Sequence, residues 1–436
     1  MSIRTVITEM GEHNSKNLLG GFFYGWVIVA VALVSMGFWM GIRSSFSIFY
    51  VALLDDFSWN RGASAGVQSV ALIAYTVCAP VVGGMIDRYG PRRVIPVGIL
   101  VHALGLMLCA TIRDLGQFYL YYGVIAGAGI TAIGIVAYSA IISHWFEEKR
   151  GLASGLAVSG MGFGTFLLVP LSQYLISLWG WRVSFLVLGG MVFLILFPLN
   201  GFFLRHTPGE LGLYPDGNKE PDTAACGPTS AVACAPVAEW TLRSVLGTLK
   251  FWSLMAFASL AISAVFVVLV HNVRLMVDTG LSKMAAAMMF AMVGIVSSVF
   301  RIFWGWLSDR ISRETTYSMG ALCACLGVVS LMLLEGTGHK GFVYAYFMLF
   351  GMGWGATAPM FMAVAADLFK GKIFGLIYGF VEGGVGVGAA FGAWFAGFMF
   401  DKTGSYRLVL GYAIGALLLS ILFVWTAAPR KVRARR

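Results

Sequence analysis

The chain has 436 residues, of which 59% are hydrophobic and only 11% are charged. Soluble domains carry about 25% charged residues, and a soluble protein of this size could not cover its surface with so few. The net charge of +10 does not indicate a nucleic-acid-binding protein, because the basic residues stand in short clusters between long apolar runs.

Twelve apolar runs are long enough to cross a bilayer, which takes about 20 residues per helix. The composition and these runs predict an all-α membrane protein with twelve transmembrane helices in two pseudo-symmetric six-helix halves. In chain order the runs fall near 22–50, 63–86, 94–112, 117–144, 151–178, 182–204, 250–271, 285–307, 316–336, 341–366, 373–399 and 406–427.

Polar segments divide the chain. An N-terminal segment, 1–21, precedes a first span that is too long for a signal-peptide core. Six-helix bundles are expected at 22–205 and 250–428. Between them lies 206–249, which contains five prolines and is predicted to be a flexible linker. The chain ends in a basic tail, 429–436.

The six cysteines predict neither disulfides nor a metal site. Cys226 and Cys234 lie in the linker and the other four lie in apolar runs, without any C-x-x-C pair. No Gly-rich nucleotide-binding loop occurs either, so ATP-driven transport and cofactors are not expected.

The distribution of basic residues orients the spans. With the N-terminus in the cytoplasm, twenty of the 30 Lys and Arg residues fall in cytoplasmic segments and eight fall outside. Because basic residues accumulate in cytoplasmic loops, both termini are predicted to be cytoplasmic, in a multi-pass protein of the cell inner membrane.

Internal repeats relate the two halves. Asp87 follows the second span and Asp309 follows the eighth, 222 residues later. Gly151 and Gly375 begin similar G-L-x-x-G stretches in the fifth and eleventh spans, 224 residues apart. Matches at nearly one offset indicate a duplicated unit, a plan that places the solute near the midplane between the halves.

The loop after the second span reads G-x-x-x-D-R-x-G-x-R-R and resembles the signature loop of the major facilitator superfamily. The resemblance implies a gating latch between the halves on the cytoplasmic side. An Asp at a helix end can meet the N-terminal dipole of another helix, with neighbouring arginines adding salt bridges. The basic residues are also consistent with a role in topology alone. The latch residues are Gly83, Asp87, Arg88, Gly90, Arg92 and Arg93, with Asp309 and Arg310 in the second copy.

Four further stretches resemble the monocarboxylate transporters and the oxalate–formate antiporter-like group: 25–29, 145–155, 208–217 and 400–406. The resemblance implies a secondary transporter rather than an enzyme. It would move a small organic anion, expected to be a monocarboxylate, by alternating access, with a proton as the candidate coupling ion. We expect it to function as a monomer in the lipid bilayer, without nucleic acid.

Three charged residues lie deep in apolar runs, where a charge costs about 2.5–3.5 kcal/mol. Arg301 lies in the eighth span, and its planar guanidinium suits bidentate capture of a carboxylate. The monocarboxylate transporters resemble the chain here, with a substrate-binding Arg four residues before a Gly, as Arg301 stands before Gly305. Arg43 in the first span is the second substrate candidate. Structural ion pairing is the alternative for both arginines.

Glu382 in the eleventh span is the third mid-span charge. It is either a proton-coupling site or the permanent counter-ion of an arginine. Proton-coupled monocarboxylate transporters resemble this chain but often carry an Asp where Ser297 stands, so Glu382 or Asp367 would have to replace it. His271 is a further proton candidate.

Tyr138, Trp354 and Tyr378 are weaker substrate-binding candidates, because aromatic residues in spans more often pack or lie at the membrane interface. Rival functions are export of amphipathic compounds, exchange of dicarboxylates or other anions, and reception of a carboxylate without transport. A receptor would need a signalling domain, for which the linker and the tail are too short.

Overall fold

The computed structural model describes residues 23–59, 61–217, 240–427 and 429. The predicted N-terminal segment, most of the basic tail, and Cys226 and Cys234 of the linker lie outside the described residues. Those described form helices and no strand, which confirms the predicted all-α fold.

The described residues contain eleven helical runs that are long and apolar enough to cross a membrane, and one of them, Arg150–Phe203, has 54 residues. Gly180 breaks this run with φ 75° and ψ 170°, a backbone conformation that glycine adopts without steric cost. The break divides the run into two spans, so the described residues contain the predicted twelve. The main helices are α2 (Gly25–Phe57), α3 (Arg61–Tyr89), α4 (Pro91–Cys109), α7 (Ile135–Trp145), α8 (Arg150–Met191), α9 (Phe197–Phe203), α11 (Leu249–Asp278), α12 (Lys283–Arg310), α13 (Arg313–Thr337), α14 (Gly341–Gly355), α15 (Thr357–Phe369), α16 (Phe374–Thr403) and α17 (Arg407–Ala427).

Several helices extend beyond the predicted apolar runs. Helix α2 has 33 residues, about 50 Å at 1.5 Å per residue, whereas the hydrocarbon core of a bilayer is about 30 Å thick. The extra turns contain polar residues such as Asp55. Hydropathy detects only the part of a helix that lies in lipid, which explains why the predicted boundaries were too short.

Both ends of the predicted flexible linker are ordered. Two short 3-10 helices, η4 (Pro208–Leu211) and η5 (Pro215–Gly217), follow the first half, and α10 (Leu242–Leu246) precedes α11. Residues 218–239, between these ordered ends, lie outside the described part of the chain.

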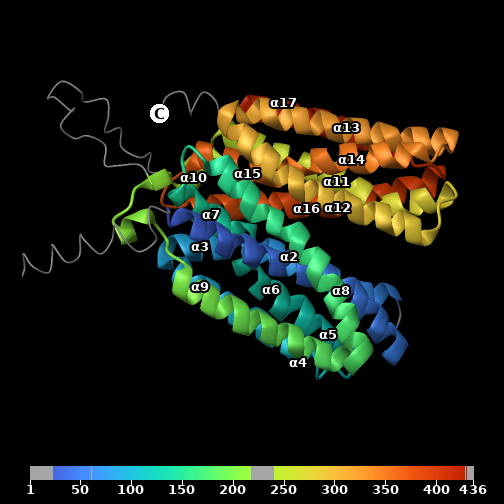
Figure 1. Cartoon of the computed structure of the whole chain (residues 1–436), viewed down its shortest axis with the longest axis horizontal. Helices are drawn as coiled ribbons and strands as arrows, with labels where there is room; N and C mark the ends of the chain where they lie inside the picture. Colours follow the sequence, from blue (N-terminus) through green and yellow to red (C-terminus); the bar gives the residue numbers. More distant parts are fainter. Residues whose placement is uncertain (1–22, 60, 218–239, 428, 430–436) are drawn as a thin grey trace, which may run out of the picture.

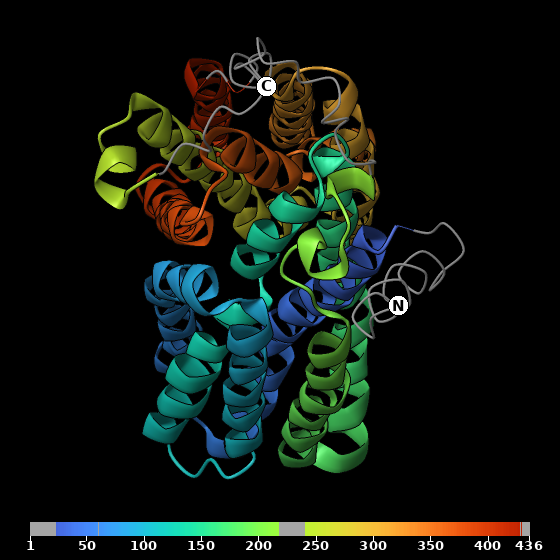
Figure 2. The ribbon, with the colours of Figure 1, turned by 90° about the vertical axis from the view of Figure 1, so that its left-hand side faces the viewer.

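The helices form two groups. Figure 2 shows the helices of residues 25–203 on one side and those of 249–427 on the other. In Figure 1 the groups meet near α7, α10 and α15 and diverge toward the other end of the bundle. We call the end that carries Asp87 and Asp309 the latch end.

The buried core follows the same arrangement. One apolar cluster fills the first half and continues into the second half through residues such as Leu254, Phe361 and Phe374, near the latch end. A separate cluster, which includes Val268 and Leu410, belongs to the second half alone, toward the other end. The two halves therefore share a core only at the latch end, which is closed.

Candidate functional site

Two aspartates cap helices across the boundary between the halves. Asp87 of α3 accepts hydrogen bonds from the backbone N–H groups of Gly375 (2.9 Å) and Leu376 (2.8 Å), at the start of α16. Asp309 of α12 accepts from Gly151 and Leu152 at the start of α8, both at 2.8 Å. Each carboxylate thus satisfies free N–H groups at the positive end of a helix dipole. We call these two caps the latch.

Glycine makes each cap possible. A side chain on Gly83 would overlap the backbone carbonyl of Gly375, and one on Gly151 would overlap that of Gly305. These contacts bring α3 against α16 and α8 against α12 with backbones in direct contact. Gly90, with φ 79°, supplies the turn after which Pro91 begins α4.

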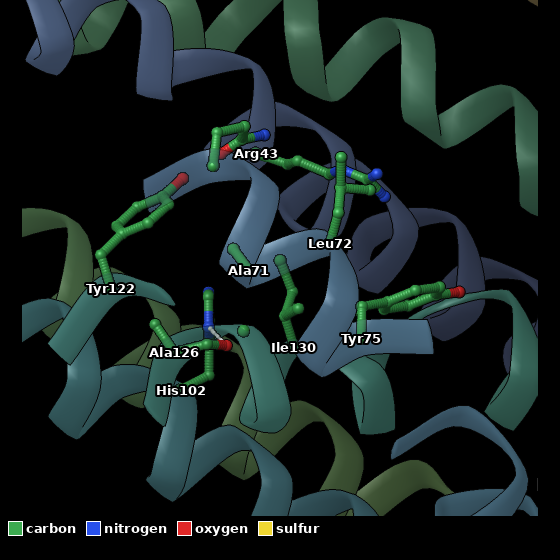
Figure 3. A pocket seen from close by; sticks show the side chains of 10 residues that line it. Arg43, Ala71, Leu72, Tyr75, His102, Tyr122, Ala126 and Ile130 are labelled. Atoms are coloured by element: carbon green, nitrogen blue, oxygen red, sulfur yellow. Dashed lines mark hydrogen bonds between the residues drawn. The ribbon is translucent and has the colours of Figure 1, made fainter. Parts of the chain in front are cut away.

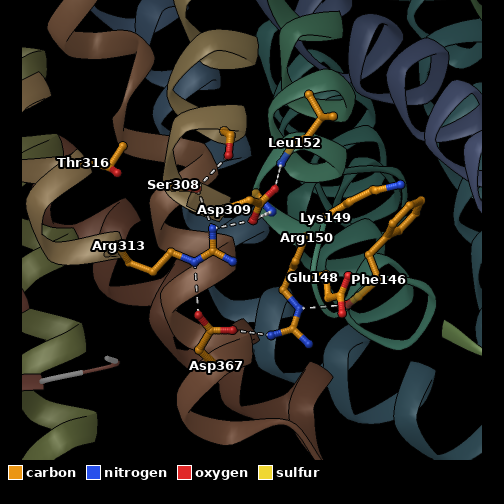
Figure 4. Close-up of polar contacts among 12 residues, drawn as sticks. Phe146, Glu148, Lys149, Arg150, Leu152, Ser308, Asp309, Arg313, Thr316 and Asp367 are labelled. Atoms are coloured by element: carbon orange, nitrogen blue, oxygen red, sulfur yellow. Dashed lines mark hydrogen bonds and ion pairs between the residues drawn. The ribbon is translucent and has the colours of Figure 1, made fainter. Parts of the chain in front are cut away.

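A buried network of charges reinforces the Asp309 cap (Figure 4). Asp367 of α15 forms ion pairs with Arg150 of α8 and with Arg313 of α13, the second at 3.1 Å. Arg313 also pairs with Asp309 at 2.7 Å. The side chains of Arg150, Arg313 and Asp367 are 3%, 1% and 7% exposed, so two cations and two carboxylates balance one another away from water.

The network corrects one expectation from the sequence. Salt bridges were expected from the arginines next to the latch aspartates, but Arg313 supplies the one to Asp309. Within the described residues Arg88, Arg92, Arg93 and Arg310 form no ion pair; Arg88 and Arg310 lie over the rings of Tyr89 and Trp306. Sequence reasoning counted Arg150 and Arg313 among the basic residues of the cytoplasmic segments, and it did not pair Arg313 with Asp309, which stands four residues earlier on the preceding helix.

The stretch at 208–217, noted for its resemblance, braces the loop before α8. Asp216 accepts hydrogen bonds from the backbone N–H groups of Glu147 (2.7 Å), Glu148 (2.8 Å) and Lys149 (3.2 Å). Glu147 in turn forms an ion pair with Lys370 of the second half. The start of the linker is therefore connected to the closed latch end.

Arg301 lies between the two halves and is 5% exposed. Its Nη1 donates to the backbone carbonyl of Val158 on α8 (2.9 Å), and its guanidinium lies 5.4 Å from the ring of Trp354. Its Nε has no hydrogen-bond partner, and no carboxylate among the described residues pairs with it. The hydroxyl of Ser297, one turn earlier, is also buried without a partner. Arg301 is thus a buried cation with unused donors.

Arg43 faces a different group of residues. Its guanidinium lies 5.5 Å from the ring of Trp39 and 5.6 Å from that of Tyr75, and it interacts electrostatically with Glu382 of α16. The hydroxyl of Tyr75 donates to Glu382 at 3.3 Å. Tyr378, one turn before Glu382, faces the same carboxyl group. Arg43, Tyr75 and Glu382 therefore connect the first half to the second near mid-span.

Arg43 also lines a pocket inside the first half (Figure 3). Its cavity volume is about 20 Å³, which is room for one or two water molecules, and it is partly open to solvent. Sequence reasoning did not single out any of its polar residues except Arg43, because the others are uncharged or a lone histidine. The pocket is lined by Arg43, Gln68, Ala71, Leu72, Tyr75, His102, Tyr122, Ala126, Gly127 and Ile130.

The remaining candidates are dispersed. Tyr138 is fully buried inside the first half, where its hydroxyl donates to Asn200 at 2.6 Å, so it faces neither arginine site. Asp367 lies in the latch network rather than beside Arg301. His271 packs its ring 5.9 Å from that of Tyr406 on the second half. Only Arg301 with Trp354, and Arg43 with Glu382 and Tyr378, are brought together.

Comparisons with known proteins agree with this architecture. The family model described as Major Facilitator Superfamily matches residues 27–377. The chain is 27% identical to monocarboxylate transporter 13 of Rattus norvegicus over 94% of its length and 89% of the relative's. It is 28% identical to monocarboxylate transporter 11 of Homo sapiens over 93% and 83%.

Solved structures share the fold at low sequence identity. The E. coli fucose:proton symporter FucP superposes with a TM-score of 0.69 at 14% identity, covering 92% of this chain and 98% of that one. A XylE variant with two added tryptophans gives a TM-score of 0.70 at 16% identity, covering 94% and 98%.

Proposed function

The chain belongs to the major facilitator superfamily and is a membrane transporter; we propose that it moves a small monocarboxylate by alternating access, as a monomer. One observation carries the substrate class: Arg301 is a buried cation whose described contacts are a carbonyl and an aromatic ring. A buried guanidinium without a carboxylate is costly, and an incoming carboxylate supplies the missing partner. The relatives named as monocarboxylate transporters support the same class.

Alternating access requires two states of the protein, and we propose that they differ in whether the latch is closed or open. In the state described here, Asp87 and Asp309 close the latch end. We assign this end to the cytoplasm of a cell inner membrane, with both termini on that side, because the basic residues accumulate there. Anion binding at Arg301 would neutralise the buried charge and favour the transition between the states, since a ligand shifts an equilibrium only through differential affinity.

A thermal-shift screen tests the substrate class. Purified protein is heated in detergent with carboxylates of one to six carbons, with oxalate, and with amphipathic cations. Monocarboxylates are expected to raise the melting temperature, because a ligand that binds only the folded state stabilises it. A shift with oxalate alone would favour dicarboxylate exchange, and shifts with the cations alone would favour export of amphipathic compounds.

Glu382 is the proposed proton site. A carboxyl group in an apolar span is costly when ionised, and the hydroxyl of Tyr75 and the charge of Arg43 adjoin it. In proteoliposomes, an inward proton gradient is expected to stimulate uptake by the wild type and to leave uptake by Glu382→Gln unchanged. An equal response of both proteins would make Glu382 a structural counter-ion instead.

A further inference from the structure

Three contacts to the second half come from consecutive residues, 147–152, at the start of α8 (Figure 4). Two are ion pairs, and the third is the Asp309 cap. The contacts join Glu147 to Lys370, Arg150 to Asp367, and the backbone of Gly151 and Leu152 to Asp309. The backbone of this short stretch must hold one conformation for all three contacts to form at once. Whatever fixes that backbone therefore affects the whole latch end.

A carboxylate of the same half fixes this backbone. Asp216 accepts hydrogen bonds from the successive N–H groups of residues 147–149, at 2.7, 2.8 and 3.2 Å. The N–H groups of Gly151 and Leu152, further along, donate to Asp309 of the second half. The donors at the positive end of α8 are thus divided between two carboxylates, one from each half. Because Asp216 belongs to the same half as α8, its hydrogen bonds do not have to break when the latch opens.

The segment that carries Asp216 is anchored to the first half. Residues 208–217, which we call the brace, contain two backbone hydrogen bonds of 3.1 Å that fold the segment on itself. Just before the brace, the carbonyl of Arg205 accepts a hydrogen bond from Nε1 of Trp145 at 3.2 Å. The ring of Phe23, which precedes α2, packs against the last residue of the brace. Asp216 therefore has a fixed position from which to hold the loop.

The backbone conformation of Asp216 makes its carboxylate separately testable. Asp216 has φ 59° and ψ 4°, in the left-handed region. Glycine adopts this conformation without steric cost, and Asn and Asp adopt it more readily than other residues. Glycine or asparagine can therefore replace Asp216 while the backbone of the brace is kept.

We propose that Asp216 is a positioning residue of the latch. Its hydrogen bonds fix the backbone that presents the first N–H groups of α8 to Asp309. They also place Glu147 beside Lys370. Asp216 therefore favours the state in which the latch end is closed, and the brace acts on the gating equilibrium in addition to linking the halves. This inference rests on the proposed alternation between a closed and an open latch.

Hydrogen exchange at the cap that Asp216 does not touch tests the inference. The N–H groups of Gly375 and Leu376 donate to Asp87, at the other cap of the latch. In Asp216→Gly, without ligand, they are expected to exchange about tenfold faster than in the wild type, because losing hydrogen bonds to a charged group moves the equilibrium toward the open latch. Asp216→Asn keeps an acceptor but loses the charge, so it should give a smaller increase.

Two further variants are the controls. Asp114 caps α5 (Leu115–Phe118), between the third and fourth spans and away from the latch end, where it accepts a hydrogen bond from Gln117 at 2.9 Å. Asp114→Asn should therefore leave exchange at the Asp87 cap unchanged. Asp87→Asn weakens one cap of the latch directly. It should accelerate exchange at the other cap, on Asp309, because the two caps open together.

The outcomes separate this inference from the function on which it rests. Faster exchange in Asp216→Gly at residues 147–149 alone would show that Asp216 only orders the loop, and would leave alternating access standing. Unchanged exchange in both Asp216 variants would also overturn the inference. If Asp87→Asn does not accelerate exchange at the Asp309 cap, both the latch with two states and this role of Asp216 fail. Should Asp216→Gly not fold, the increase expected of Asp216→Asn decides.

Discussion

Replacing Arg301 by leucine is expected to remove carboxylate binding while leaving the empty protein at least as stable. Truncating one partner of a buried charge pair costs about 2–5 kcal/mol, so affinity for the carboxylate should fall about 30-fold or more. Uptake and the carboxylate-induced thermal shift measure the loss. Arg301→Lys should recover only part of the affinity, because an ammonium group lacks the planar fork that binds both carboxylate oxygens.

The stability of the empty protein distinguishes this role from a structural one. Arg301 is 5% exposed, and its described partners are the carbonyl of Val158 and the ring of Trp354. Such a cation costs free energy in the empty state, so leucine should not lower the melting temperature measured without ligand. Arg407→Ala, at an exposed arginine, is the control. A clear drop in the melting temperature of Arg301→Leu, with carboxylate binding retained, would show that Arg301 only holds the helices together.

Replacing Gly83 by leucine is expected to keep the latch end from closing and to reduce transport severely. A side chain at this position would overlap the backbone of Gly375, which cannot move away while Asp87 caps the same helix turn. Most of the apolar core of the first half lies within that half, and the second half has a cluster of its own, so the variant should still fold. The equilibrium should then move toward the state that is open at the latch end.

Hydrogen exchange measures this shift directly. The N–H groups of Gly375 and Leu376 donate to Asp87 and should be protected in the wild type. They should exchange faster in Gly83→Leu. Gly190→Leu is the matched control, because nothing lies within 4 Å of a side chain built on Gly190. Wild-type transport together with wild-type protection in Gly83→Leu would show that this close contact is not needed for closure.

The architecture was readable from the sequence because lipid imposes a simple condition. Every span must be a helix of about 20 apolar residues, so hydropathy alone predicts their number and order. The repeats at Asp87 and Asp309 likewise indicated two related halves. Helix ends were predicted less well, since the turns outside the hydrocarbon region carry no hydropathy signal, as Asp55 in α2 shows.

The candidate residues divide in a similar way. Arg43, Arg301 and Glu382 were identifiable because a charge inside an apolar span is rare and costly. The partners of these residues could not be identified from the sequence, because each partner lies on a helix far away along the chain. Arg301 contacts Val158, and Glu382 contacts Tyr75. Tyr138 is a candidate that the structure places away from both arginine sites. Its position in a span did not indicate that its hydroxyl would donate to Asn200 in the interior of the first half.

The sequence by itself determined that this chain is an all-α membrane protein with two related halves, because so few charged residues could not cover a soluble protein of this size. Its resemblance to the major facilitator superfamily indicated a transporter. Only the tertiary structure decided which charges balance one another. Asp367 is neutralised by Arg150 and Arg313 in the closed latch end, whereas Arg301 pairs with no described carboxylate. The tertiary structure also brought His102 and Gln68 to one pocket. Electrostatic pairing depends on distances across helices, and these distances are fixed by packing rather than by position along the chain.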